Sequence, residues 1–445
     1  MLSTLPNELR FLIISCLRRN GCSLASLAAT SCIWRDLIEP QNFAHITLTP
    51  CRLPRFKLIA PCKRHFIRAI WFRIDLEDTR IDVRRIDVWE TNLELIESAF
   101  RSLFSTLSLW DPSDGDLALD LSVFSPWDTK PCFAHIPLKP DLTDTQCDHD
   151  QELGLPAGIV HNLAPTASQL KRAFDQVPAP FTGGMPFPSV PWYSFDLVSL
   201  FSQMPRLEQV HYEPWRAWSA EQQLSMDEDY TAITCEHFTP ALRRLIVSEN
   251  FSENYMAIMQ ASSPREHRCQ LLTQTFARQS LQLEMLSVSF MVEASNFFDE
   301  CKPSWTWPDL TSLTLTSQLL TPSADANSLF RKAAEVAMQM PHLKTMEIWN
   351  GRAGLAGMFQ YRLEPGLIVW KGTWNLKLEE YAIQAWQAVA SLHGVELHVK
   401  QEMLDETKMT CVGSAVHHLG HSERVFRPVS LRQVRIHEFE EVKGL

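Results

Sequence analysis

Residues whose types could bind a metal or carry out catalysis form no complete site that can be recognised in this sequence. His417, His418 and His421 place imidazoles at helical spacing, which offers a metal two ligands on one face. Cys147-Asp148-His149 has no second ligand pair of the kind that a zinc site needs. The chain also lacks a Gly-x-Ser-x-Gly turn and a Gly-rich phosphate-binding loop, and it holds only 15 glycines. We therefore expect no enzyme activity, no catalytic residue, no metal and no cofactor.

The composition is that of a globular protein with an acidic surface. Hydrophobic residues make up 45% of the 445-residue chain, which is enough to bury a sizeable core. The net charge of -11 argues against general binding to nucleic acid, because phosphates attract clustered Lys and Arg. A basic stretch at 52–73 is followed directly by an acidic one at 75–90, so we expect the two to pair or to face solvent.

The sequence shows no signature of a membrane or secreted protein. No apolar run approaches the ~20 residues that cross a bilayer, and residues 1–20 carry Glu8 and Arg10 within their apolar pattern, unlike a signal peptide. Eleven cysteines without regular spacing indicate reduced thiols rather than disulfides. We expect a soluble protein of the cytoplasm, the nucleus or both, with neither a membrane nor a nucleic-acid partner.

Three short helices are predicted at the N-terminus. Pro6 suits a first helical turn, and Asn20-Gly21 ends the first helix with turn chemistry. Ser23 and Ser31 are the predicted N-caps of a second and a third helix, and the third is predicted to stop at Pro40. A unit of about 40 residues is too small to bury all of its apolar side chains. The surplus apolar surface therefore requires either a partner or the rest of the chain.

Residues 5–38 follow the order of a known helical adaptor. Leu-Pro-Asn-Glu-Leu opens the segment, an aliphatic pair and Leu17 follow, and Trp-Arg-Asp-Leu-Ile closes it. The segment resembles an F-box, which binds a Skp1-type subunit of a ubiquitin ligase and, through it, a cullin. The alternative from periodicity alone is a helical cap on a larger domain. The resemblance implies eight contact residues for the Skp1-type subunit: Leu5, Pro6, Leu9, Ile13, Leu17, Leu24, Leu27 and Trp34.

A short phrase recurs further along the chain. A proline or a helix end is followed by Leu-x-x-aliphatic-x-aliphatic, and the alternation predicts a strand with one buried face. Helical patterns precede some copies, as at 197–201 and 329–338. The leading leucines of the copies lie 35, 41, 27 and 33 residues apart: Leu207, Leu242, Leu283, Leu310 and Leu343.

Alternating strands and helices of this kind resemble leucine-rich repeats, which F-box proteins often carry. The predicted fold class is α/β, with an N-terminal three-helix F-box followed by an irregular leucine-rich-repeat-like α/β solenoid. Earlier strands at 69–76, 107–110 and 117–123 are expected to join the same sheet. A compact doubly wound α/β domain is the structural alternative.

Two regions differ in composition from the rest of the chain. Eleven prolines fall between Pro126 and Pro191, which predicts a long surface insertion at about 125–191 or, alternatively, a disordered one. The stretch 346–400 predicts strands at 367–370 and 395–399 around a helix at 378–392. It also holds four tryptophans, which suit either a packed cap or a binding hot spot: Trp349, Trp370, Trp374 and Trp386.

The predicted organisation is an F-box at 1–45, a recognition domain at 46–400, and a C-terminal extension or cap at 401–445. Phrases such as Tyr-Glu-Pro-Trp-Arg at 212–216 resemble a group of fungal F-box-containing proteins. The resemblance implies a substrate-recognition adaptor of an SCF-type (Skp1-cullin-F-box) ubiquitin ligase, which binds a protein target through its repeat domain. The alternatives are an F-box scaffold acting outside degradation, or a small-molecule-binding or enzymatic domain capped by helices.

Overall fold

The computed structural model divides the chain into two compact units, 1–126 and 127–445, each considered by itself. The organisation predicted from the sequence has its boundaries near residues 45 and 400. The predicted insertion at 125–191 and the helical pattern at 197–201 lie outside the described residues. The structure describes the following residues: 5–20, 22–75, 86–110, 117–124, 206–213, 223–224, 227–228, 230–231, 240–249, 270–420 and 425–426.

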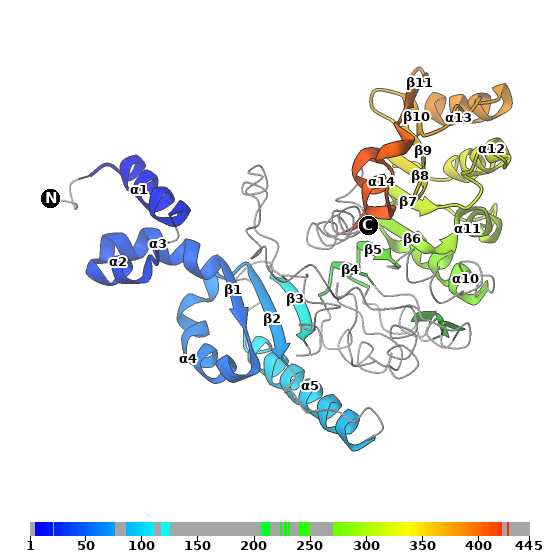
Figure 1. Cartoon of the computed structure of the whole chain (residues 1–445). Helices are drawn as coiled ribbons and strands as arrows, with labels where there is room; N and C mark the ends of the chain where they lie inside the picture. Colours follow the sequence, from blue (N-terminus) through cyan, green and yellow to red (C-terminus); the bar gives the residue numbers. More distant parts are fainter. Residues whose placement is uncertain are drawn as a thin grey trace, which may run out of the picture. The chain divides into compact units, whose positions relative to one another are not determined.

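The first unit joins short helices to a small parallel sheet (Figure 1). Its three strands lie in the order β1-β2-β3, and every neighbouring pair is parallel. Parallel strands need crossover connections, which α4 and α5 provide. The elements are α1 (Asn7–Arg19), α2 (Ala25–Thr30), α3 (Cys32–Ala44), β1 (His45–Leu48), α4 (Leu53–Lys63), β2 (Ala69–Asp75), α5 (Ile86–Leu107) and β3 (Ala118–Phe124).

Four predictions in this unit are wrong. The second helix has Leu24 rather than Ser23 at its N-cap, without a side-chain cap, whereas Ser31 does accept a hydrogen bond from the Trp34 N–H. Residues 107–110 form the end of α5 and a turn instead of a strand, because the apolar residues of α5 recur at helical spacing. The predicted strands at 69–76 and 117–123 do form, but in this separate sheet.

The third helix also runs past Pro40, where it was predicted to stop, and ends at Ala44. Contacts with α4 stabilise the residues on both sides of the proline. Lys63 lies 2.5 Å from the Glu39 carboxylate and 5.8 Å from the centre of the Phe43 ring. These tertiary contacts offset the hydrogen bond that a proline removes from a helix.

The second unit is built on a largely parallel sheet of eight strands, with helices on both faces. The strands lie in the order of the chain from β4 to β11, and β9 is antiparallel to both of its neighbours. The prediction of an α/β fold is confirmed. A doubly wound sheet would need a reversal of strand order, and the described strands show none. The strands are β4 (Gln209–Tyr212), β5 (Arg244–Ser248), β6 (Met285–Glu293), β7 (Ser312–Thr316), β8 (Thr345–Arg352), β9 (Leu355–Arg362), β10 (Leu367–Gly372) and β11 (His398–Met403).

All five copies of the recurring phrase form neighbouring parallel strands, β4 to β8. The residue after each leading leucine occupies the same position. The Arg243 N–H donates to the Glu208 carbonyl, and the Glu284 N–H donates to the Arg243 carbonyl, each at 2.8 Å. Thr311 and Lys344 continue the same ladder at 2.8 Å. The copies are therefore equivalent in backbone hydrogen bonding as well as in sequence.

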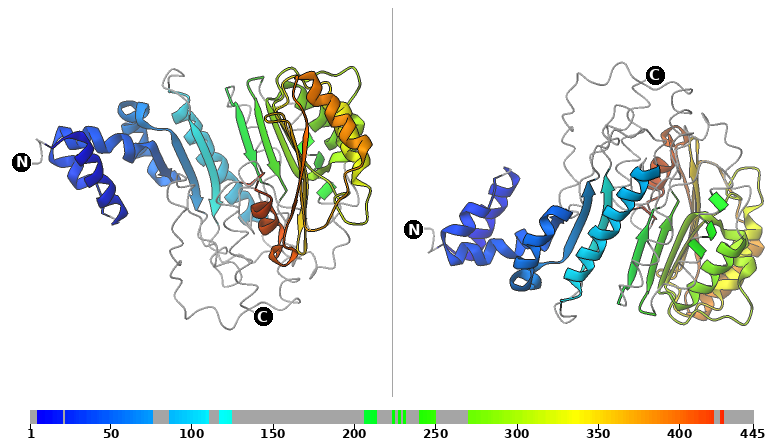
Figure 2. Two further views of the ribbon diagram at one scale, coloured as in Figure 1. Left: turned by 90° about the horizontal axis from the view of Figure 1, so that it is seen from above. Right: turned by 90° about the horizontal axis from the view of Figure 1, so that it is seen from below.

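The face of this sheet that carries α10 to α13 forms the main core (Figures 1 and 2). Leu286, Leu313 and Met346 are fully buried and lie in register across three strands. Aromatic rings continue the row, because Tyr361 packs against Trp386 of α13 with the ring centres 4.6 Å apart and the planes tilted by 31°. The helices are α10 (Gln270–Gln279), α11 (Ala294–Glu300), α12 (Ala326–Ala337), α13 (Glu380–Leu392) and, on the other face, α14 (Val412–Leu419).

The helix α14 covers part of the opposite face of the sheet. It packs against Trp349 and Met358 in one buried cluster. The close approach depends on Gly351, because a Cβ there would lie 2.5 Å from the Cβ of Ala415. Residues 412–419 therefore belong to the sheet's core rather than to a separate C-terminal extension.

The tryptophans of the C-terminal region are packing residues. Trp349, Trp370 and Trp386 are fully buried. The indole N–H of Trp386 donates to the Phe330 carbonyl at 3.0 Å, which satisfies its polar atom within the core. Trp374 is half-buried and meets Trp370 edge to face. Core packing, one of the two readings of these residues, is the one that the structure supports.

We expect Trp386→Ala to lower the free energy of unfolding by about 3–5 kcal/mol, because it empties a closed aromatic site and removes a buried hydrogen bond. Gln384→Ala, an exposed change in the same helix, is the matched control and should stay within about 0.5 kcal/mol. Urea denaturation followed by circular dichroism measures both. Equal stability of the two variants would contradict the assignment of Trp386 to the core.

A second prediction concerns thiol reactivity. Burial, with a smaller contribution from Glu300, raises the pKa of the Cys301 thiol to about 12, so at pH 8 its reactive thiolate is rare. We expect iodoacetamide to leave Cys301 unmodified in the native protein and to modify it after denaturation, as read by mass spectrometry. Rapid native labelling of Cys301 would show this prediction to be wrong. The exposed thiols of the first unit serve as internal controls: Cys16, Cys22, Cys32, Cys51 and Cys62.

Candidate functional site

The N-terminal helix α1 carries apolar side chains on two sides. On the inner side, Ile14 is 1% exposed and packs in the core of the three helices. On the outer side, Leu9 and Leu12 are 46% and 56% exposed. Together with the exposed Cys16 they are spaced i, i+3 and i+7, so they share one face of the helix. We call Leu9, Leu12 and Cys16 the outer stripe.

The core beneath this helix is small, but its side chains are shielded from solvent. Leu24, Trp34 and Ile38 are at most 5% exposed and contact Ile14. Helices α1 and α3 contribute Ile14, Trp34 and Ile38, and Leu24 comes from the N-cap of α2. The core therefore holds α1 in place while its outer stripe stays in solvent. Leu9 and Leu12 form an apolar patch on one helix face, and apolar patches that are large enough mark interaction sites.

The eight residues that the F-box resemblance implied fall into two groups. Five of them belong to the closed core or pack against it: Ile13, Leu17, Leu24, Leu27 and Trp34. Of the other three, Leu9 and Pro6 are exposed and Leu5 is half-buried. Leu24 and Trp34 thus hold the helices together and offer little surface to a partner.

The structure adds exposed apolar residues that were not among the eight. Leu12 is one turn from Leu9, and the helical spacing of the two was a usable signal in the sequence. Phe11 and Ile33 are 47% and 38% exposed, but nothing in the sequence distinguished them from core residues. Ile14, which was not among the eight either, is the most buried residue of α1.

Some basic side chains of the stretch 52–73 make contacts within the first unit. Lys63 pairs with Glu39, and the buried Arg64 guanidinium lies 4.3 Å from the centre of the Trp110 ring. Arg64 also donates to the Ile67 carbonyl at 3.1 Å. Two of the cations are therefore unavailable to a polyanion, and most of the following acidic stretch lies outside the described residues.

Of the two sequence motifs with metal-ligating side chains, only His417 and His418 lie among the described residues. His417 and His418 lie on α14 with their rings 5.2 Å apart. No group of three His, Cys, Asp or Glu side chains able to hold a metal occurs in the part of the chain that the structure describes. His421 and residues 147–149 lie outside that part.

The face of the large sheet opposite α10–α13 carries a buried polar row. Ser287, Thr314, Glu347 and Gln360 are paired across β6 to β9, and each is at most 3% exposed. The Glu347 carboxylate accepts hydrogen bonds from Gln360 and from the Thr314 hydroxyl, the latter at 3.3 Å. These bonds stabilise a carboxylate inside the sheet, where an unpaired one would be costly.

A surface hollow lies where β8 begins and β9 ends. Lys344, Thr345 and Arg362 line it, with Leu363 and Glu364. A catalytic pocket usually gathers side chains whose pKa values are displaced. The described residues whose pKa values are displaced do not line the hollow: Tyr230, Cys301, Tyr361, Tyr381, Glu402 and Asp405. The α1 surface is therefore the better candidate site.

Comparisons with known proteins assign the second unit to no described activity. Residues 237–427 are similar to a family of unknown function, DUF6546. The matched stretch begins before β5 and ends after α14, so it includes the helix that packs on the far face of the sheet. A search of curated proteins and a search of solved structures each gave no match. Within the described residues, no helix has the length and apolar character needed to span a membrane.

The division between core and surface predicts a large loss of stability for one substitution in the N-terminal helices and almost none for another. Trp34→Ala should destabilise the first unit by about 3–5 kcal/mol, because it empties the small core. Leu9→Ser should change stability by no more than about 0.5 kcal/mol, because the side chain is already in water. Denaturation curves of the full chain measure both. A large loss of stability with Leu9→Ser would mean that the outer stripe is part of the fold.

Proposed function

We propose that the chain is a non-catalytic adaptor whose N-terminal helices bind a Skp1-type subunit and whose second unit binds a protein target for an SCF-type ubiquitin ligase. The observation that carries the proposal is the outer stripe of α1. Leu9 lies within the Leu-Pro-x-Glu-Leu sequence that resembles an F-box, and it remains exposed with Leu12 although the helices have a closed core. Such an adaptor works in the cytoplasm, the nucleus or both.

The proposed contact combines direct and indirect roles. Leu9 and Leu12 would be buried by the partner, and each buried leucine contributes about 1.5–3 kcal/mol. Leu24 and Trp34 would position α1 against α2 and α3 without touching the partner. This division refines the eight-residue contact set, because only part of it is accessible on the surface.

We also propose that β4 to β8 form a degenerate leucine-rich-repeat-like array that presents the target-binding surface. Two observations support it: the five phrases occupy equivalent positions in neighbouring parallel strands, and α10 to α13 line a single face. Solenoids repeat one strand-and-helix unit in this way. The antiparallel strand β9 departs from the pattern and would mark the end of the array.

The adaptor proposal predicts that the full chain co-purifies with a Skp1-type subunit and that Leu9→Asp/Leu12→Asp abolishes this. Two charged side chains in place of two buried leucines should weaken binding on the order of a hundred- to ten-thousand-fold. Leu58→Asp is the matched control, since Leu58 is an exposed leucine of the same unit, 80% exposed on α4. Titration calorimetry gives the affinities, and circular dichroism confirms the fold of each variant.

Unchanged binding by the Leu9→Asp/Leu12→Asp variant would overturn this assignment of the contact surface. Proteins captured with the wild-type chain, but not with the double variant, are candidate targets only if they require the Skp1-type subunit. The half-life of such a target, measured with and without the chain, then separates a degradation adaptor from a scaffold. An effect on half-life that persists in the double variant would contradict the ligase role.

A further inference from the structure

The large sheet has an open edge at β11. Five of the six residues of this strand are exposed, and Glu402 is partly so. The N–H groups of His398 and Leu404 donate inward, to the carbonyls of Gly366, just before β10, and of Gly372, at its end. Because backbone groups alternate in direction along a strand, those of Val399, Gln401 and Met403 point outward. Within the described part of the chain these outward groups have no backbone hydrogen bond. An open strand edge is a template for another strand.

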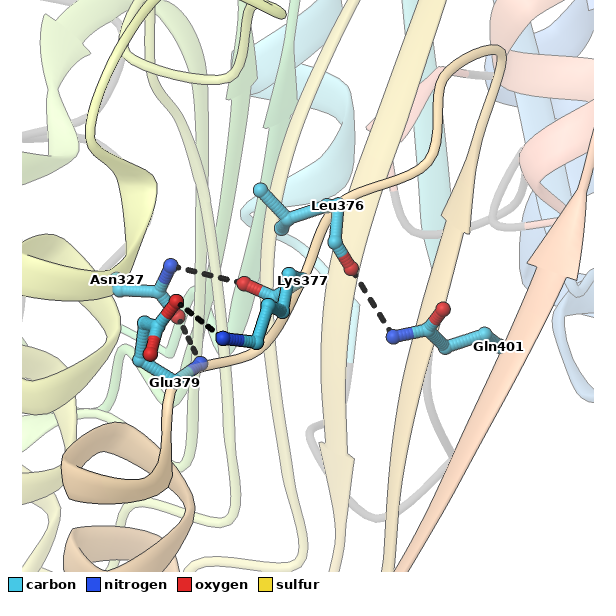
Figure 3. Close-up of polar contacts among 5 residues, drawn as sticks. All are labelled: Asn327, Leu376, Lys377, Glu379 and Gln401. Carbon is cyan, nitrogen blue, oxygen red and sulfur yellow. Dashed lines mark hydrogen bonds and ion pairs between the residues drawn. The ribbon is translucent and has the colours of Figure 1, made fainter.

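The open edge is held firmly from inside. The loop between β10 and α13 is fixed at both sides, as Figure 3 shows. Asn327 of α12 donates to the Lys377 carbonyl at 3.0 Å and accepts from the Glu379 N–H at 2.9 Å. The Gln401 side chain of β11 donates to the Leu376 carbonyl at 3.0 Å. The edge strand is therefore presented in an ordered position rather than as a loose end.

We propose that a second copy of this chain pairs with β11 in an antiparallel arrangement centred on Gln401, so that two sheets join across a two-fold axis. In this register Lys400 of one copy lies opposite Glu402 of the other. Val399 of one copy likewise lies opposite Met403 of the other. The strand β11 is thus complementary to a second copy of itself, as a symmetric interface requires.

The side chains select this register over its neighbours. A shift of the centre to Lys400 would place two lysines opposite each other, and a shift to Glu402 would place two carboxylates opposite each other. Like charges directly opposite are destabilising, whereas opposite charges stabilise a pair of strands. Lys400 on an edge strand normally discourages the addition of another strand. Glu402 removes that penalty in this one register.

The backbone geometry is consistent with the same centre. The backbone N–H and C=O groups of Val399, Gln401 and Met403 point outward. With the two-fold axis at Gln401, these three residues of one copy lie opposite the same three residues of the other. The pairing would form about six hydrogen bonds across the axis. Lys400 and Glu402 then fall at the closer, non-hydrogen-bonded positions, where side chains interact most strongly.

Neighbouring groups favour the arrangement further. Glu402 already lies 2.7 Å from Lys400 and 3.2 Å from Lys371 of its own chain, and these lysines lower the pKa of its carboxyl group. In the pair, each Glu402 would also face a Lys400 from the other copy. Two residues of the edge strand itself are apolar and exposed: Val399 and Met403 are 42% and 60% exposed. Pairing would remove apolar surface from water.

Two charge reversals test the proposal. Lys400→Glu alone and Glu402→Lys alone each place like charges opposite each other in the pair, so each should weaken self-association roughly ten- to hundredfold. A mixture of the two variants restores opposite charges and should form a heterodimer. Sedimentation equilibrium of the full chain reads the mass, with 51.0 kDa expected for one copy and twice that for the pair.

Lys344→Glu is the control, because it reverses an exposed lysine outside β11 and should leave association unchanged. Val399→Pro is an independent variant: it removes an outward N–H, which an edge strand tolerates, and should leave a folded single copy. If the wild-type chain were a single copy at about 100 μM, the proposal would be overturned. It would also be overturned if Lys400→Glu alone and Glu402→Lys alone both left self-association unchanged. A wild-type pair whose variants fail to recombine on mixing would place the interface elsewhere. None of these outcomes depends on binding to a Skp1-type subunit.

Discussion

Hydrogen bonds at the entrance of each parallel strand set the geometry on which the second unit depends. The carbonyl of Glu208 accepts from Arg243, that of Arg243 from Glu284, that of Glu284 from Thr311, and that of Thr311 from Lys344. Each bond fixes one strand relative to the one before it, and the shared register carries the buried leucines into line. The helices on one face, the polar row on the other and the open edge at β11 all follow from this stacking.

Much of this sheet could be predicted from the sequence, because the recurring phrase combines a buried leucine with strand alternation. Leu283, Leu310 and Leu343 are at most 1% exposed, as the pattern implied. The antiparallel strand β9 could not be predicted in the same way, since it has no leading leucine and its residues are buried on both faces. The position of α14 depends on Gly351, a close approach between distant segments that no local pattern records.

The candidate site was predicted less completely than the fold. The order of apolar residues placed three helices at the N-terminus, and they are present. Periodicity alone did not separate the inner side of α1 from the outer stripe, because both sides are apolar. Trp34 matched the F-box pattern but is 4% exposed, so a sequence match does not distinguish a contact residue from one that supports the contact. The helix continues through Pro40 for a related reason: Lys63, far along the chain, stabilises it.

The strand order of the large sheet has a consequence for how the protein is made. From β5 to β11, each described strand pairs with the strand that precedes it in the chain. During synthesis every strand therefore meets a partner that has already left the ribosome, and only the segment between consecutive strands must close at each step. Folding of this unit can follow synthesis without waiting for later segments. The exception is α14, which returns to β8 and β9 and completes the core when the C-terminal segment emerges.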